Sequence, residues 1–267
     1  MTTITRTDTR TTSRLGMPGW ARMLQTETLL YLRDPGNGIF VLLFPTVLLL
    51  GISYFMPGMR EPLVDAGPQW TGVPPAHFFA PVMISVAVAT AGLTALPNYL
   101  ASYRETGVLR RLSTTPMRPQ GLLLAQLVVN AAALVVGSVL AIGLGMALLE
   151  VPMPQQLLLT LGVTLLATGA TFGIGMIIGG VVDKATTAGG IGMIVYFPML
   201  FLAGLWTPGP AMPDSVAQVA TYTPLGAASQ ALMEAWFGDG MPWRQLVVMA
   251  LWAALTFVVA ARTFRWR

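Results

Sequence analysis

Residues 38–56 read GIFVLLFPTVLLLGISYFM and carry no charged side chain. A helix needs about 20 mostly apolar residues to cross roughly 30 Å of hydrocarbon, and this stretch meets that requirement. Comparable runs recur along the chain, and the candidate spans are about 38–56, 78–101, 121–149, 157–182, 189–206 and 245–261. Prolines inside the runs predict kinks, because neighbouring helices can satisfy the freed backbone groups. The pattern predicts an all-α integral membrane protein with six transmembrane helices over residues 38–267.

The composition of the whole chain agrees with this fold class. Of the 267 residues, 54% are hydrophobic and 10% are charged, whereas about 25% are charged in a typical soluble domain. The chain has no cysteine and one histidine, His77, which excludes disulfides, thiolate metal sites and histidine clusters. We therefore expect no catalytic residue, no metal site and no nucleic-acid partner.

The positions of lysine and arginine predict the orientation, because positively charged loops stay on the cytoplasmic side. Nearly all of the 15 Lys and Arg residues lie before the first span, between spans two and three, between spans four and five, or at the C-terminus. Arg60 and Arg244 are the exceptions. Both termini are therefore predicted to be cytoplasmic. Residues 1–16 contain no apolar stretch, so we expect a flexible cytoplasmic tail and no cleaved signal peptide.

Residues 17–37 predict an interfacial helix followed by a turn into the membrane. Placed at 100° per residue, one arc of the helix is apolar and contains Trp20, Met23, Leu24, Leu30 and Tyr31. Glu27 interrupts this arc, so a plain cytoplasmic helix is the alternative interpretation.

A second segment outside the spans, residues 103–116, reads YRETGVLRRLSTTP. It is basic and lies on the predicted cytoplasmic side, so contact with anionic lipid is the simpler interpretation. The spacing of Val108, Leu109 and Leu112 also fits a short helix whose apolar stripe docks into a partner protein. Composition alone favours the lipid-facing loop.

Residues 207–243 have no lysine or arginine and five prolines. They are too polar for further spans. A re-entrant element on the outer side and a plain outer loop fit equally well.

Glycines and amides inside the spans predict close helix packing. Gly169 to Gly173 and Gly175 to Gly179 form two frames of small residues, which indicate close approach within the bundle, with dimerisation as the alternative. Asn98, Gln126 and Asn130 are polar, and the residues alone favour hydrogen bonds between helices for all three.

The chain lacks the groups that would let it power transport by itself. The spans carry no Asp, Glu, Lys, Arg or His, which argues against an ion- or proton-coupled carrier and against a charged channel. The only lysine, Lys184, does not fit the phosphate-binding motif Gly-x-x-x-x-Gly-Lys-Ser/Thr. Energy for uphill transport would have to come from another chain at a cytoplasmic surface.

Three motifs point to a family. They are Leu32-Arg33-Asp34-Pro35, the segment from Arg104 to Pro116, and Gly204-Leu205-Trp206-Thr207-Pro208 with Met212-Pro213 and Thr223-Pro224-Leu225. Together they resemble the permease subunits of type-2 ATP-binding-cassette exporters, especially the daunorubicin-resistance-like bacterial permeases, over nearly the whole chain after residue 17.

The resemblance implies a role for several residues. The segment 103–116 looks like the coupling helix that seats in a groove of the ATPase, with Glu105 as its polar anchor. The residues implied at this contact are Arg104, Glu105, Val108, Leu109, Arg110, Arg111 and Leu112. The resemblance also implies a substrate path along spans two and five, for which Asn98, Tyr196 and Phe197 are the candidates.

The resemblance further implies partners and cofactors. Two permeases, identical or different, would pair with two separate ATPase subunits, which bind ATP and Mg, while this chain binds no cofactor. We predict a multi-pass permease of the bacterial cell membrane that exports drugs, natural products or lipid-like molecules. The alternatives are an ion- or proton-coupled carrier and a non-transporting scaffold or immunity protein.

Overall fold

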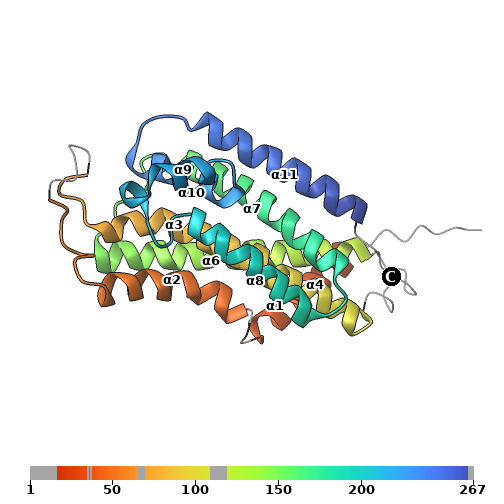
Figure 1. Ribbon diagram of the computed structural model, residues 1–267. Coiled ribbons are helices and arrows are strands. Elements are labelled where there is room, and N and C mark those ends of the chain that lie inside the picture. Colours follow the sequence, from red (N-terminus) through yellow and green to blue (C-terminus); the bar gives the residue numbers. More distant parts are fainter. Residues whose placement is uncertain (1–16, 35, 37, 65–69, 109–118, 264–267) are drawn as a thin grey trace, which may run out of the picture.

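The computed structural model describes residues 17–34, 36, 38–64, 70–108 and 119–263. Six helical spans in this part of the chain are long and apolar enough to cross a membrane, and they form a bundle (Figure 1). They are α2 (Gly38–Phe55), the continuous run of α3 (Pro75–Ala89), η1 (Thr90–Ala95) and α4 (Leu96–Glu105), then α6 (Pro119–Leu149), α7 (Leu157–Val181), α8 (Ala185–Leu202) and α11 (Trp243–Thr263). No strand occurs among the described residues. The prediction of an all-α protein with six apolar spans is confirmed.

The bundle has two different ends (Figure 1). One end, which we call the α4 end, carries α1 (Met17–Leu32), the last turn of α4, the start of α8 and the end of α11. The opposite end, the α10 end, carries η2 (Gly209–Ala211), α9 (Asp214–Ala220) and α10 (Pro224–Phe237).

The second span is the centre of the bundle. Every residue in its most apolar window is buried, against 17–44% in the other spans. Its middle, η1, is a short π-helix just before Pro97. Because Pro97 has no N–H, it cannot make the regular bond to the Leu93 carbonyl four residues earlier. Such wide turns are rare and occur mostly at functional positions.

Glycines let the neighbouring helices approach this centre. A Cβ on Gly175 of α7 would lie 2.0 Å from the Gly92 carbonyl oxygen, and one on Gly192 of α8 would lie 2.2 Å from that of Leu93. A Cβ on Gly173 would lie 2.0 Å from Thr256 Oγ1 of α11, and one on Gly179 would lie 2.7 Å from Leu100 Cβ. These contacts confirm close packing within the bundle for both glycine frames of span four.

The fifth span differs from its predicted bounds. It was expected at 189–206, whereas α8 runs from Ala185 to Leu202. The polar Thr186 and Thr187 belong to its first turn, and Gly204 closes it with φ 84°, a conformation that favours glycine.

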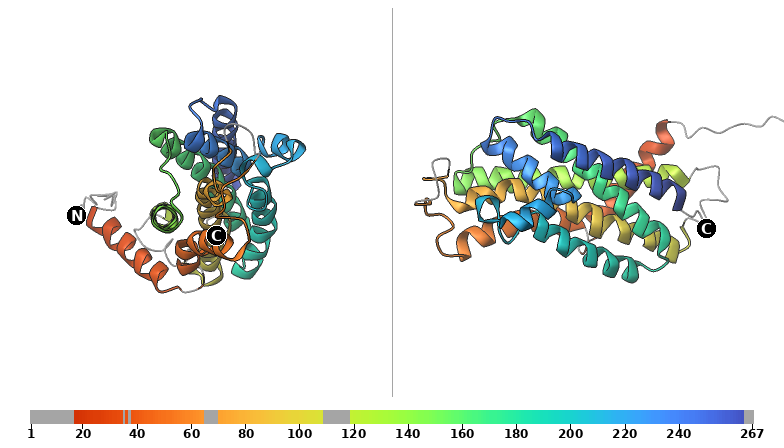
Figure 2. Two further views of the ribbon diagram at one scale, coloured as in Figure 1. Left: turned by 90° about the vertical axis from the view of Figure 1, so that its left-hand side faces the viewer. Right: turned by 45° about the horizontal axis from the view of Figure 1, so that its top comes forward.

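Helix α1 lies across the bundle and not along it (Figure 2). Its buried residues are Glu27 and Tyr31, while Leu30, which was placed on the apolar arc, is 53% exposed. The face of α1 that packs on the bundle therefore includes Glu27 and leaves Leu30 exposed. The inward stripe is centred on the carboxylate, because that carboxylate has partners inside the bundle.

Residues 207–243 are largely helical. Thr223 begins α10 by accepting a hydrogen bond from the Gly226 N–H at 3.2 Å, with Pro224 at the first helical position. Helix α10 then packs against α3, α7 and α11. The indole N–H of the buried Trp236 donates to the Pro152 carbonyl at 2.8 Å, which ties α10 to the loop before α7.

Candidate functional site

The last turn of α4 is fastened to the start of α8. Glu105 Oε2 accepts a hydrogen bond from the backbone N–H of Ala185 at 3.0 Å. Ala185 is the first residue of α8, so this carboxylate satisfies one of the free N–H groups and lies at the positive end of the helix dipole. The Arg104 guanidinium lies 4.0 Å from the Asp183 carboxylate in the loop before α8. Two adjacent residues of α4 therefore hold the connection between α7 and α8.

The described residues of the predicted coupling segment differ in their exposure to solvent. Glu105 is exposed and Val108 is half-buried. The Arg104 side chain is only 5% exposed, whereas that of Asp183 is 90% exposed. Arg104 is thus turned toward its own chain, as the long apolar stem of arginine allows. Leu109, Arg110, Arg111 and Leu112 lie outside the described residues.

The chain turns sharply just after α4. Gly107 has φ 70°, and its N–H donates to the Arg104 carbonyl at 2.9 Å. This left-handed conformation after a helix end suits glycine. It directs the chain away from the α4 axis directly before Val108.

A polar cluster inside the α4 end joins three helices. Glu27 of α1 is 7% exposed. Its Oε2 accepts hydrogen bonds from the Tyr103 hydroxyl of α4 and from Gln126 Nε2 of α6, the latter at 2.6 Å. Asn130 Nδ2 donates to Gln126 Oε1 at 3.2 Å and so extends the cluster along α6. A buried carboxylate needs such donors, and these bonds hold α1 on the bundle.

A second contact fastens the turn after α1. The Tyr99 hydroxyl donates to Asp34 Oδ2 at 2.9 Å, and the rings of Tyr31 and Tyr99 lie 5.5 Å apart between centroids. Burial and the nearby Asp34 carboxylate raise the pKa of Tyr31, so its phenol stays neutral. This contact therefore joins the turn after α1 to α4, next to the Glu27 cluster that joins α1 to α4 and α6.

Sequence reasoning missed the Glu27 cluster. It treated Glu27 as an interruption of an apolar arc, yet Glu27 follows Leu24 by three residues and precedes Tyr31 by four. A carboxylate at that spacing lies on the inward face, which indicates a buried partner. The expectation that Gln126 bonds between helices is confirmed.

Of the three candidate substrate-path residues, Tyr196 and Phe197 lie side by side on α8, with ring centroids 5.6 Å apart, and Asn98 lies on α4. Tyr196 is buried, and its hydroxyl is 3.0 Å from Thr90 Oγ1. The neighbouring Phe197 is 55% exposed on α8. Asn98 lines a cavity of about 410 Å³ near the start of α8, and a Cβ on Gly189 would lie 2.9 Å from its Oδ1.

A family model described as ABC-2 family transporter protein matches residues 75–262. The match begins at the first residue of α3 and ends in α11, so it includes every spanning helix except α2. It also includes the end of α4, the start of α8, and η2, α9 and α10 of the α10 end. A comparison with curated proteins finds no match.

Proposed function

Because the chain belongs to the ABC-2 family of transporter proteins, and is therefore a multi-pass membrane permease that works with an ATP-binding subunit, we propose that it exports drugs, natural products or lipid-like molecules from a bacterial cell. The described spans are strongly apolar, and apolar helices support a cargo that is itself amphipathic or lipid-like. In this proposal the ATPase binds ATP and Mg²⁺, and two ATPases join two permeases, identical or different, in the plasma membrane.

In this proposal the ATPase docks at the end of α4 and its motion is passed to the permease there. This coupling proposal rests on the hydrogen bond between the Glu105 carboxylate and the Ala185 N–H. An ATPase that docks at the end of α4 would meet the exposed Glu105 and the half-buried Val108. Motion imposed there would reach α8 through Ala185 and through the Arg104–Asp183 pair. It would also travel along the unbroken run of α4, η1 and α3 through the middle of the bundle.

The same run reaches the α10 end. Helix α10 packs on α3, and α8 packs on η1 and α4. A displacement of the α4 end against α1, α6 and α8 would therefore change the packing of the helices that close the opposite end. In this proposal the Glu27 cluster keeps α1 fixed while α4 transmits the motion.

Docking of the ATPase is tested with Glu105→Gln. The glutamine oxygen can still accept the Ala185 N–H, so the start of α8 keeps its cap while the charge is lost. We expect membrane insertion to be unchanged and the ATPase recovered in a pull-down to fall by about five- to tenfold, as for a charge desolvated at an interface. Substrate-stimulated ATP hydrolysis by the complex should fall with it.

The matched control for this test is Glu61→Gln, an exposed carboxylate outside the α4 end. It should leave both the recovery of the ATPase and the stimulated hydrolysis unchanged. The coupling proposal is wrong if the two variants behave alike, or if Glu105→Gln retains full stimulation.

The orientation is tested with single cysteines, since the native chain has none. Ser215 on α9 and Thr106 after α4 are both exposed, at the α10 end and the α4 end. We expect Ser215→Cys to react with an impermeant thiol reagent in intact cells, and Thr106→Cys to react only after lysis. The opposite labelling would overturn the cytoplasmic placement of the termini and of the ATPase contact.

A further inference from the structure

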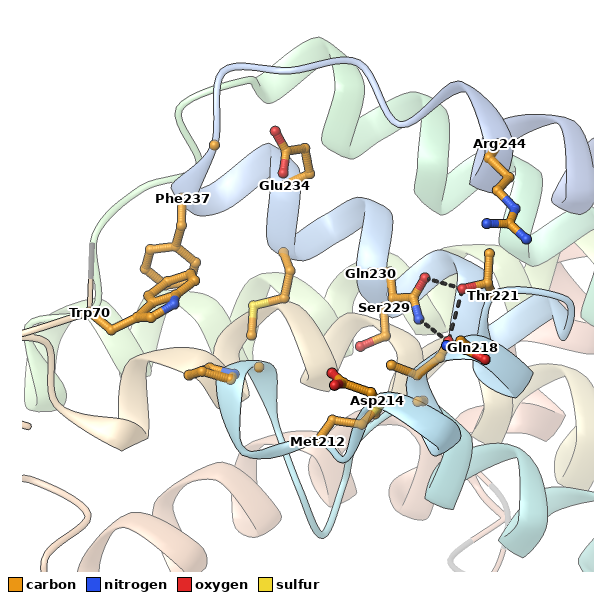
Figure 3. A pocket seen from close by; sticks show the side chains of 16 residues that line it. Trp70, Met212, Asp214, Gln218, Thr221, Ser229, Gln230, Glu234, Phe237 and Arg244 are labelled. Carbon is orange, nitrogen blue, oxygen red and sulfur yellow. Dashed lines mark hydrogen bonds between the residues drawn. The ribbon is translucent and has the colours of Figure 1, made fainter. Parts of the chain in front are cut away.

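The α10 end contains an open cavity of about 670 Å³. It lies between η2, α9, α10 and the first turn of α11 (Figure 3). The residues that matter for its chemistry are Trp70, Asp214, Ser229, Glu234, Phe237 and Arg244. They come from four separate parts of the chain: the segment before α3, α9, α10 and α11.

One end of the cavity has an aromatic wall. The rings of Trp70 and Phe237 both line it and meet edge to face, with centroids 5.8 Å apart. Phe78 packs behind them, 5.1 Å from Trp70 and 5.5 Å from Phe237 between centroids. Three rings that brace one another hold a fixed position, and the faces of such rings attract cations.

Two carboxylates lie on opposite walls of the cavity, Glu234 from α10 and Asp214 from α9 (Figure 3). Glu234 Oε1 accepts the Gly240 N–H at 2.9 Å, which fixes the direction of that carboxylate. Neither carboxylate forms an ion pair with another described residue. The cavity therefore offers two carboxylates that form no close ion pair with a described side chain.

Among the described residues that line the cavity, the single cationic side chain is that of Arg244, which lies at the far end from Trp70 (Figure 3). Its guanidinium donates to the Tyr222 hydroxyl and lies 4.8 Å from the centroid of that ring. This double contact keeps the positive charge away from the aromatic end.

A buried hydroxyl faces the same space. Ser229 of α10 is 5% exposed, lines the cavity, and has no hydrogen-bond partner among the described residues. Figure 3 shows its oxygen on the side of α10 that faces Asp214. Because Ser229 lines the cavity, its hydroxyl is available to a bound molecule or its water.

We propose that this cavity binds an organic monovalent cation with an apolar, preferably aromatic, body. The positive centre would lie between Glu234 and Asp214, and the body would pack against Trp70 and Phe237. A metal ion fits less well, because no cluster of three metal-ligating side chains occurs among the described residues. The site goes beyond the proposed export function, since binding by the permease needs no ATPase.

The test compares two ions of nearly the same shape and opposite charge, tetraphenylphosphonium and tetraphenylborate. Their binding to the purified permease in maltoside micelles is measured by equilibrium dialysis, with empty micelles subtracted. The native chain should bind the cation more tightly than the anion. Glu234→Gln should weaken binding of the cation by about tenfold and leave that of the anion unweakened.

Two further variants of the lining and one control sharpen the result. Asp214→Asn, at an exposed position, should weaken cation binding in the same direction without a risk to folding. Arg244→Gln removes a like charge and should strengthen cation binding several-fold. Glu61→Gln, outside the cavity, should have no effect. Equal binding of the two ions by the native chain, or equal effects of Glu234→Gln and Glu61→Gln, would overturn the site.

A lipid headgroup and a freely diffusing amphiphile could both supply the cationic centre. Short-chain phosphatidylcholine added as a competitor separates the two sources. If the lipid displaces tetraphenylphosphonium, the site takes a headgroup as its ligand. If the lipid does not displace it, the site takes a free cation. Because no ATPase is present, failure here would leave the Glu105 proposal standing, and failure of the pull-down would leave this site standing.

Discussion

Gly175→Ala is expected to destabilise the permease by about 1–3 kcal/mol, which is the usual cost of forcing an extra methyl group into a packed core. A Cβ at this position would lie 2.0 Å from the carbonyl oxygen of Gly92, a backbone atom of η1. A backbone atom in the central helix cannot turn aside as a side chain does. Helices α7 and η1 would have to separate, and the contacts around them would weaken together.

The matched control lies in the same helix. Gly162 is exposed, and a Cβ added to it meets nothing within 4 Å. Gly162→Ala should therefore be neutral, or stabilising by up to about 1 kcal/mol through helix propensity. The same contrast between a blocked and an open position exists in α8. A Cβ on Gly192 would lie 2.2 Å from the Leu93 oxygen, whereas a Cβ on Gly190 would meet nothing within 4 Å.

Thermal unfolding of the purified variants in one detergent measures this difference. The apparent Tm of Gly175→Ala should fall by roughly 3–10 °C relative to that of Gly162→Ala. Equal melting temperatures would mean that α7 is not held against η1 in the way the Gly92 contact requires.

Glu27→Ala should have the second large effect, about 2–5 kcal/mol, because it removes the carboxylate that accepts hydrogen bonds from two donors inside the bundle. These donors are the Tyr103 hydroxyl and Gln126 Nε2. The loss should release α1 from α4 and α6 before the rest of the bundle unfolds. Trypsin should then cut faster after Arg22 and Arg33, which are exposed residues at α1.

The double variant Glu27→Ala with Tyr103→Phe separates this cluster from a general loss of packing. Once the phenol is gone, removal of the carboxylate should cost less, by a coupling of about 0.5–3 kcal/mol. Glu61→Ala, at the exposed surface, should stay within about 0.5 kcal/mol of the native chain. Strict additivity of the Glu27 and Tyr103 changes would contradict the proposed bond between them.

The sequence by itself determined the class of the fold. The apolar runs had to be helices, because the bilayer leaves only structures that satisfy their own backbone groups, and their length is set by the hydrocarbon thickness. The glycine frames of α7 were also readable, since a missing Cβ is a property of the residue. Gly173, Gly175 and Gly179 all lie at close helix contacts.

Only the tertiary structure decided which span lies at the centre. The most apolar window of the run of α3, η1 and α4 has a mean hydropathy of 1.9, the same as that of α7, yet the first window is 100% buried and the second 44%. Lipid tails are as apolar as a protein core, so hydropathy cannot distinguish a lipid-facing helix from a buried one.

The polar sites were hidden for a related reason. The partners of Glu27 lie 76 and 99 residues away along the chain, and the cavity at the α10 end combines Trp70 with residues that follow Ala203. In the sequence, a single carboxylate or indole only interrupts an apolar pattern. Its role depends on which distant donors, rings and charges the folded chain places against it, and that placement is a property of packing alone.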